Sequence, residues 1–359
     1  MERVRISVLR WLSVCAMLVF HTGTPIAQNV TIDRESAPVK YYRMPDEPLD
    51  PSYKTYTTEV VAYSGDLIRS GITVASLESE YLTLEGYAKD QRNGDVHLEA
   101  TVSDFSVFSE TRESRQSKSK DKDGKEIVTT HYWIEVKYAL PVSMSVRDRD
   151  GHVLDDRFIF TLTDQRSYST PSYKSTSDLD NYWRINRTRQ LAELHKSMLT
   201  EAFRKIKEIV NNTFGYRRIT NENARFETIG KKKHLEYARY KKAVETIRKG
   251  FTLMDPDKSL DAVRKAVEPA LTFYQNREKA YSSTDKDLFK LKHICLYNLA
   301  LAYFWLEDFD KATQYAQAIL KLYEKDRDVK RLIEEIDEVK TSLLRADKSS
   351  RHMIEVSRS

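Results

Sequence analysis

Alternation of apolar and polar residues predicts a β-rich stretch between about residues 55 and 165. From Tyr132 to Val146 every second residue is apolar, and most of the residues between them are polar. A strand with this period buries one face and exposes the other to water. Residues 96–107 alternate in the same way, with a change of phase at Ser103 and Asp104 that predicts a β-bulge.

Three dipeptides separate these runs: Asn93-Gly94, Asp123-Gly124 and Asp150-Gly151. Asn-Gly and Asp-Gly both favour the positive φ angles of type I′ turns, so we expect each of the three dipeptides to close a hairpin. The resulting meander needs a second layer over its apolar face. We expect a second sheet, which gives a small β-sandwich, and a covering helix is the alternative. The highly charged stretch 112–123 predicts a long solvated hairpin tip, or a tip that reaches a partner.

A helical period replaces the alternation after residue 178. Apolar residues recur every three or four positions through Leu191, Met198 and Ile206, in a helix predicted to begin at Asp178 or Asp180. Further helices are predicted at 233–253, 259–281 and 329–344. The expected organisation is a signal peptide (1–27), a β-rich domain (28–165), a linker (166–180), a helical domain (181–345) and a disordered tail (346–359).

From residue 287 onward the chain resembles a tetratricopeptide repeat. Leu299, Ala300 and Tyr303 have the spacing of the family's first helix, and Ala312 is the small residue that lets the second helix pack closely. The resemblance implies a stack of antiparallel helices, because a single repeat cannot bury its own faces. The expected fold class is therefore α+β and multidomain, with an N-terminal antiparallel β-sandwich-like domain and a C-terminal tetratricopeptide-like helical domain.

In this family the inner face of the first helices forms a groove that holds a peptide. By position, that face would carry the candidate partner-binding residues Tyr297, Leu301, Phe304 and Trp305. The alternative is that, in so short an array, these side chains pack against the neighbouring helices.

The first residues have the layout of a secretory signal. Arg3, Arg5 and Arg10 precede an apolar run over 11–20, and cleavage is predicted after Ala27. The run is shorter than the roughly 20 residues that span a bilayer. We therefore expect an exported protein without an integral membrane segment after cleavage, located in the periplasm, at the outer membrane or outside the cell. The layout is similar to that of secreted repeat proteins of Gram-negative bacteria.

The charge balance argues against a polyanion-binding protein. The chain has 59 basic and 54 acidic residues, a net charge of +5, so nucleic acid is not an expected partner. Cys295 stands alone once the signal is removed, which excludes an internal disulfide.

No cofactor, metal site or catalytic residue is predicted. Asp148, Asp150, Asp155 and Asp156 lack the spacing of a calcium-binding loop. The eight histidines include no His-x-x-x-His pair, and no Gly-x-Ser-x-Gly motif is present.

The leading hypothesis is thus an exported, non-catalytic protein-protein interaction or scaffold protein of the bacterial cell envelope, whose helical stack holds an unknown protein partner. One alternative is an enzyme acting on envelope polymers, with a site in the β domain or at the domain junction. Another is a self-assembling structural or surface protein.

Overall fold

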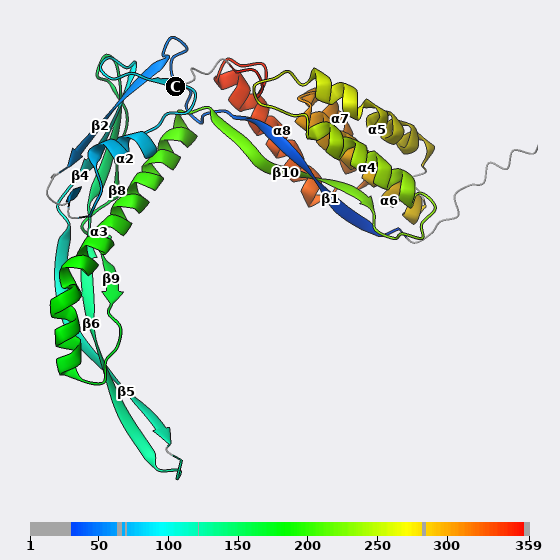
Figure 1. Ribbon diagram of the computed structural model, residues 1–359. Helices are drawn as coiled ribbons and strands as arrows, with labels where there is room; N and C mark the ends of the chain where they lie inside the picture. Colours follow the sequence, from blue (N-terminus) through cyan, green and yellow to red (C-terminus); the bar gives the residue numbers. More distant parts are fainter. Residues whose placement is uncertain (1–29, 63–66, 69, 121, 282–284, 355–359) are drawn as a thin grey trace, which may run out of the picture.

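The computed structural model describes residues 30–354, apart from 63–66, 69, 121 and 282–284, and shows a bent molecule with two arms (Figure 1). The predicted signal peptide lies outside the described residues. The first arm contains two sheets and a long helix, and the second contains five helices and a two-stranded ribbon. The mixed α and β composition, with sheets preceding a run of C-terminal helices, agrees with the predicted order at this coarse level.

Eight strands form the two sheets of the first arm. The five-stranded sheet has the order β3 (Ala88–Lys89), β2 (Thr55–Ala62), β4 (Val96–Val102), β7 (Val142–Asp148) and β8 (Val153–Phe160). The three-stranded sheet has the order β5 (Ser106–Lys120), β6 (Glu126–Ala139) and β9 (Arg166–Ser169). The pairs that β2 makes with β3 and β4 are parallel, and the other pairs are antiparallel.

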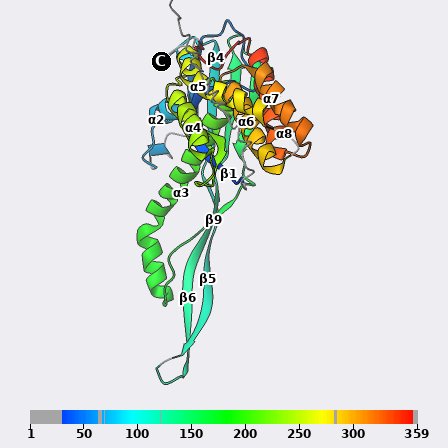
Figure 2. The same cartoon turned by 90° about the vertical axis from the view of Figure 1, so that its right-hand side faces the viewer.

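One long, interrupted hairpin links the two sheets. One side of the hairpin is interrupted between β4 and β5, and the other side between β6 and β7. The two interruptions lie opposite each other, where the Ser103 N–H donates to the Pro141 carbonyl over 3.0 Å. The break falls where the change of phase predicted a bulge, so the chain passes from one sheet to the other there. Beyond it, the β5–β6 end projects from the body of the molecule (Figure 2).

Two of the three predicted hairpins are confirmed. Asp123-Gly124 joins β5 to β6 and Asp150-Gly151 joins β7 to β8, but only the glycines have positive φ, so neither turn is type I′. The Asn93-Gly94 prediction is wrong, because β3 and β4 lie on opposite sides of β2 and both run parallel to it. Gly94 serves a different purpose there, since a Cβ would overlap the backbone of β2.

The second layer of the first arm is helix α3 (Thr176–Thr213), the alternative to the predicted second sheet. Leu199, Ala202 and Phe203 of α3 share one core with residues from both sheets. Ser175, and neither of the predicted aspartates, caps the helix by accepting from two backbone N–H groups. The short helix α2 (Val74–Glu80) packs beside β2. Residues 166–180, predicted as a linker, form β9 and the start of α3.

The second arm is a helical stack crossed by a ribbon. Strands β1 (Ile32–Arg43) and β10 (Arg217–Ile229) pair antiparallel with each other and form a sheet of their own. The helices are α4 (Tyr237–Phe251), α5 (Asp261–Ala280), α6 (Lys286–Trp305), α7 (Phe309–Leu322) and α8 (Arg327–Arg345). Each helix packs against the next, and the ribbon lies on α4 and α6 (Figure 1). No described helix combines the length and apolar character needed to cross a bilayer.

The second arm therefore uses residues from both ends of the chain. Strand β1 falls in the predicted β-rich domain, but its Ala37 and Val39 are fully buried in the core of the helical arm. Residues 346–354 belong to the predicted disordered tail, but they pack back onto the same arm. The Tyr42 N–H donates to the Arg351 carbonyl over 2.9 Å, and Ile354 is buried against Tyr42 and Leu343.

Candidate functional site

The ribbon covers the helix face that was predicted to hold a partner. Ala37 and Val39 of β1 and Phe226 of β10 share a continuous core with α4 and α6. Tyr297 lies beneath the Arg34 guanidinium of β1, which is 5.9 Å from its ring centroid. Leu301 is buried in the same core. The predicted groove is thus filled by the protein's own chain.

Asn298 of α6 holds the ribbon by its backbone. Its side chain accepts from the Glu227 N–H over 2.8 Å and donates to the Glu227 carbonyl over 2.7 Å, and the residue is fully buried. An amide side chain that pairs with both polar groups of one residue fixes the register of a strand against a helix. The ribbon is therefore fixed on the helix face that the sequence analysis proposed as a peptide-binding groove.

Charged groups reinforce this contact. His293 lies between two carboxylates, with ring nitrogens 3.1 Å from Glu227 and 2.7 Å from Asp326. Burial lowers its pKa, but the two carboxylates outweigh that effect and the net pKa is raised. Arg34 adds ion pairs to Glu227, at 3.3 Å, and to Asp328.

A second arginine occupies an aromatic cage at the end of α6. The Arg351 guanidinium carbon lies 4.8 Å from the ring centroid of Tyr41 and 5.0 Å from those of Phe304 and Trp305. Its Nε is 3.1 Å from the Glu307 carboxylate, and both side chains are buried. Burial raises the pKa of Glu307, but His352 and Arg351 together hold it at about 2. Phe304 and Trp305, two predicted partner-binding residues, thus hold the chain's own arginine.

Next to this cage an open cleft of about 810 Å³ lies between the ribbon and α8. Tyr41, Phe304 and Trp305 contribute aromatic surface to it. It is lined by six carboxylates, four of them from α8: Asp46, Glu222, Glu334, Glu335, Asp337 and Glu338. Three arginines also line the cleft, but Arg351 is already paired with Glu307. The cleft thus carries an excess of negative charge.

The carboxylates of the cleft influence one another. Burial and the nearby charges of Glu222 and Glu338 raise the pKa of Glu335 despite the opposing effect of Arg331. The Tyr41 hydroxyl donates to Glu222 over 2.6 Å, and burial together with this bond raises the pKa of Tyr41. A cation placed here would lower the free energy of these acidic groups.

The cleft was not foreseen from the sequence. Its residues come from five segments, and only the acidic run Glu334-Glu335-Ile336-Asp337-Glu338 on α8 gave a local signal. The sequence did select Phe304 and Trp305, which line it, whereas Tyr297 and Leu301 lie beneath the ribbon.

The residues that carried the repeat resemblance form the core between α6 and α7. Leu299, Ala300 and Ala312 are fully buried, and Tyr303 is 9% exposed. The Tyr303 ring stacks on Tyr315 at a centroid distance of 5.7 Å. The two alanines therefore lie on separate helices that pack against each other.

Two of the four acidic residues considered for calcium, Asp148 and Asp155, bind other groups of the protein. The Asp148 carboxylate accepts from the backbone N–H groups of Asp150 and His152 in the β7–β8 turn. Asp155 accepts from the Arg157 Nε. Asp148 and Asp155 therefore have hydrogen-bond partners within the hairpin.

Two buried sites contain residue types that can act as nucleophiles, Cys295 and Ser70. Cys295 is fully buried near the Tyr240 hydroxyl, and burial raises the pKa of its thiol to about 12, so the thiol is inert. Ser70 and His195 form a hydrogen bond between the Ser70 Oγ and the His195 Nδ1, and both are buried. Neither of them lines the cleft.

Comparisons with known proteins do not identify the chain. No family model and no curated protein matches it. A minor lipoprotein from Acinetobacter baumannii is 19% identical over 47% of this chain and 98% of its own, with a TM-score of 0.21. A putative neuraminyllactose-binding hemagglutinin homolog from Helicobacter pylori is 11% identical over 48% of this chain and 94% of its own, with a TM-score of 0.24. These likenesses are too distant to support a shared fold or function.

Proposed function

We propose that this chain is an exported, non-catalytic interaction protein of the bacterial cell envelope, whose tetratricopeptide-like helical arm holds a basic segment of a partner protein. The binding site is the acidic cleft beside the ribbon, because the inner face of α4 and α6 is already filled. The single observation that supports this most strongly is the group of carboxylates around Glu335, next to the aromatic surface of Tyr41.

The chemistry of the cleft suits lysine or arginine side chains. A cation near Glu222, Glu335 and Glu338 offsets their mutual repulsion, which no neighbouring arginine removes in full. Tyr41 lines the cleft and is only partly buried, so its ring can add a cation–π contact to a bound lysine or arginine. Arg351 gives an example within the protein, because the rings of Tyr41, Phe304 and Trp305 surround its guanidinium.

Trp305 lines the cleft as well, although it is only 7% exposed. Its indole nitrogen is buried from solvent and has no acceptor among the described residues. Trp305 can therefore offer a bound segment ring surface, and not a hydrogen bond.

Binding of synthetic peptides to the mature chain tests the proposal. We expect a Lys- and Arg-rich peptide to bind and an acidic peptide of the same length not to bind, by isothermal titration calorimetry. Changing Glu335→Gln together with Glu338→Gln should weaken binding about tenfold or more. Added salt should weaken it as well, because the cleft is open to solvent.

A matched pair of substitutions controls for net charge. Glu268→Gln with Glu324→Gln removes the same two charges at exposed positions outside the cleft. This variant should bind the basic peptide like the wild type. Equal loss in both variants, or equal binding of the acidic and basic peptides, would contradict the proposal.

A further inference from the structure

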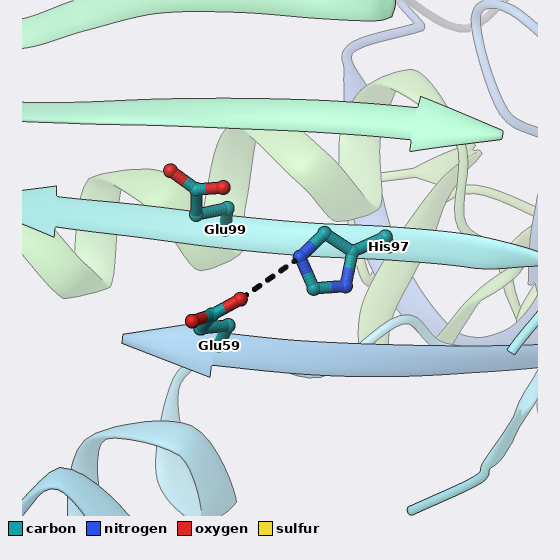
Figure 3. A group of neighbouring side chains, drawn as sticks. All are labelled: Glu59, His97 and Glu99. Atoms are coloured by element: carbon teal, nitrogen blue, oxygen red, sulfur yellow. Dashed lines mark ion pairs between the residues drawn. The ribbon is translucent and has the colours of Figure 1, made fainter. Parts of the chain in front are cut away.

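The outer face of the five-stranded sheet brings together three metal-ligating side chains. Strands β2 and β4 are parallel neighbours whose register places Glu59 beside Glu99 and Thr57 beside His97. Figure 3 shows that Glu59, His97 and Glu99 project to the same side of the sheet. Their ligand atoms all lie within 4.8 Å of one another.

The spacing of these atoms is close to that of a metal's ligands. The His97 Nε2 is 3.5 Å from the Glu59 Oε2. A tetrahedral zinc ion with bonds of about 2.1 Å holds its ligand atoms about 3.4 Å apart. Only a small rotation of the partly exposed Glu99 and Glu59 side chains is needed to complete such a set, because the strands fix both backbones.

Two of the three ligands, His97 and Glu99, also have a hydrogen-bond partner of the kind that orients ligands in metal sites. The His97 Nδ1 is 3.0 Å from the Thr57 hydroxyl, so an Nδ1–H donor leaves the Nε2 lone pair directed toward the carboxylates. The Thr101 hydroxyl donates to the Glu99 Oε1 over 3.2 Å. These bonds orient the imidazole and one carboxylate before any ion binds.

We propose that Glu59, His97 and Glu99 form a binding site for one divalent transition-metal ion of the zinc type. One imidazole and two carboxylates match the ligands that zinc accepts, and the two carboxylates balance its charge. Glu59 is largely exposed, so water or a group from another molecule completes the coordination. The site lies on the first arm and is independent of the acidic cleft.

A second group of similar composition gives the internal comparison. Asp148, Asp150 and His152 also lie within 4.8 Å of one another, but the Asp148 carboxylate already accepts from two backbone N–H groups of its turn and lies 2.9 Å from the His152 ring. Those bonds must be broken or shared before Asp148 can bind a metal. We therefore expect binding at His97 and not at His152.

Titration of the metal-free mature chain with Zn²⁺ alone tests the assignment. The wild type should bind one ion, and His97→Ala should lower the affinity at least about tenfold, while Thr57→Val, which keeps every ligand, should lower it about tenfold. His152→Asn should bind like the wild type. Circular dichroism verifies that each variant is folded. If His97→Ala does not fold, His97→Gln replaces it in the titration.

X-ray absorption of the zinc-loaded protein provides an independent measurement. It should show one imidazole nitrogen, with oxygen as the remaining ligands. The assignment is overturned if the wild type binds no zinc at micromolar concentration, if His97→Ala binds as well as the wild type, or if His152→Asn removes the binding. More than one imidazole ligand would overturn it as well.

Discussion

Arg351 and Glu307 show how one buried ion pair holds a chain end that was predicted to be disordered. Both side chains are 4% exposed, and removing one partner leaves a buried charge. We expect Arg351→Met to lower the free energy of unfolding by about 3–5 kcal/mol, the usual cost of breaking a buried pair. Urea denaturation measures it. Lys249→Met, which breaks the exposed pair with Glu245, should change stability by less than about 0.5 kcal/mol.

The Glu307 carboxyl also makes stability depend on acid pH. Its pKa is about 2 in the folded protein, below its ordinary value of 4.5. A depressed carboxyl pKa stabilises the fold above the unfolded value and loses this effect as the pH falls through the folded value. The stability difference between wild type and Glu307→Gln should therefore shrink from pH 5 to pH 2, roughly the span of these pKa values. A constant difference would contradict the assignment.

His293 should make stability depend on pH in the opposite direction. Its pKa is raised in the folded protein, because Glu227 and Asp326 outweigh the effect of burial. Its contribution is therefore complete below the unfolded pKa of about 6.5 and is lost as the pH rises through the folded pKa. The destabilisation by His293→Gln should be larger near pH 6 than near pH 9, roughly on either side of that range. Thermal unfolding at both pH values measures it.

The same residues show how far sequence reasoning reaches at this scale. Phe304 and Trp305 were selected as aromatic anchors for a partner, and the chain uses them to hold Arg351. Residue type and helix position indicated a surface that binds something, but the occupant lies 46 or more positions away in sequence and has no local signal. His97 was not predicted to bind a metal, because no second histidine follows it at helical spacing. Its nearest acidic partner, Glu59, comes from the neighbouring strand.

At the scale of elements, Asn298 tests whether the ribbon is clamped to α6. Asn298→Ala leaves the Glu227 N–H and carbonyl buried without their partners, which costs about 1–3 kcal/mol for each group. We expect faster hydrogen exchange over β1 and β10, measured by mass spectrometry. Asn186→Ala, which removes a bond within α3, should leave the ribbon unchanged. Unchanged exchange in Asn298→Ala would show that the ribbon is held by other contacts.

The projecting end of the β5–β6 hairpin, unlike the ribbon, should contribute little to stability. Its residues from Arg115 to Thr129 are almost all exposed, so they add little to the core. Replacing 115–131 by a short Asn-Gly turn keeps the Ser114–Tyr132 pair. The melting temperature of the remaining protein should be unchanged. A large drop would mean that the tip stabilises the arm.

The elements themselves were mostly visible in the sequence, whereas their partners were not. Alternation located the strands and the three-to-four-residue period located the helices, often within a few residues. The two longest predicted strands are each divided between two sheets. The division within residues 96–107 falls at the predicted bulge. The division of the other strand was not visible, because apolar alternation continues unbroken through Leu140 while the hydrogen-bond pairing changes there. Strands β1 and β10 were both missed. In β10 only the last residues, from Ala224 to Ile229, are mainly buried.

At the scale of the molecule, the division into arms depends on one long-range pairing. Ile32 pairs with Ile229 and Arg43 with Arg217, so the first strand and the tenth enclose the whole first arm between them. Such a pairing has no signature in a local pattern, which is why the predicted boundary at 165 separated β1 from the helices it packs against. As a result the ribbon covers the inner helix face, and the binding site that we propose is the acidic cleft beside α8.

A basic segment bound in the acidic cleft should protect the walls of the cleft from hydrogen exchange. Hydrogen-exchange mass spectrometry of the mature chain, with and without a Lys- and Arg-rich peptide, measures this protection. We expect slower exchange in residues 41–46 and 334–345, which border the cleft, with no change at the β5–β6 tip. Protection of the tip or of the first arm, with none at the cleft, would contradict the proposal.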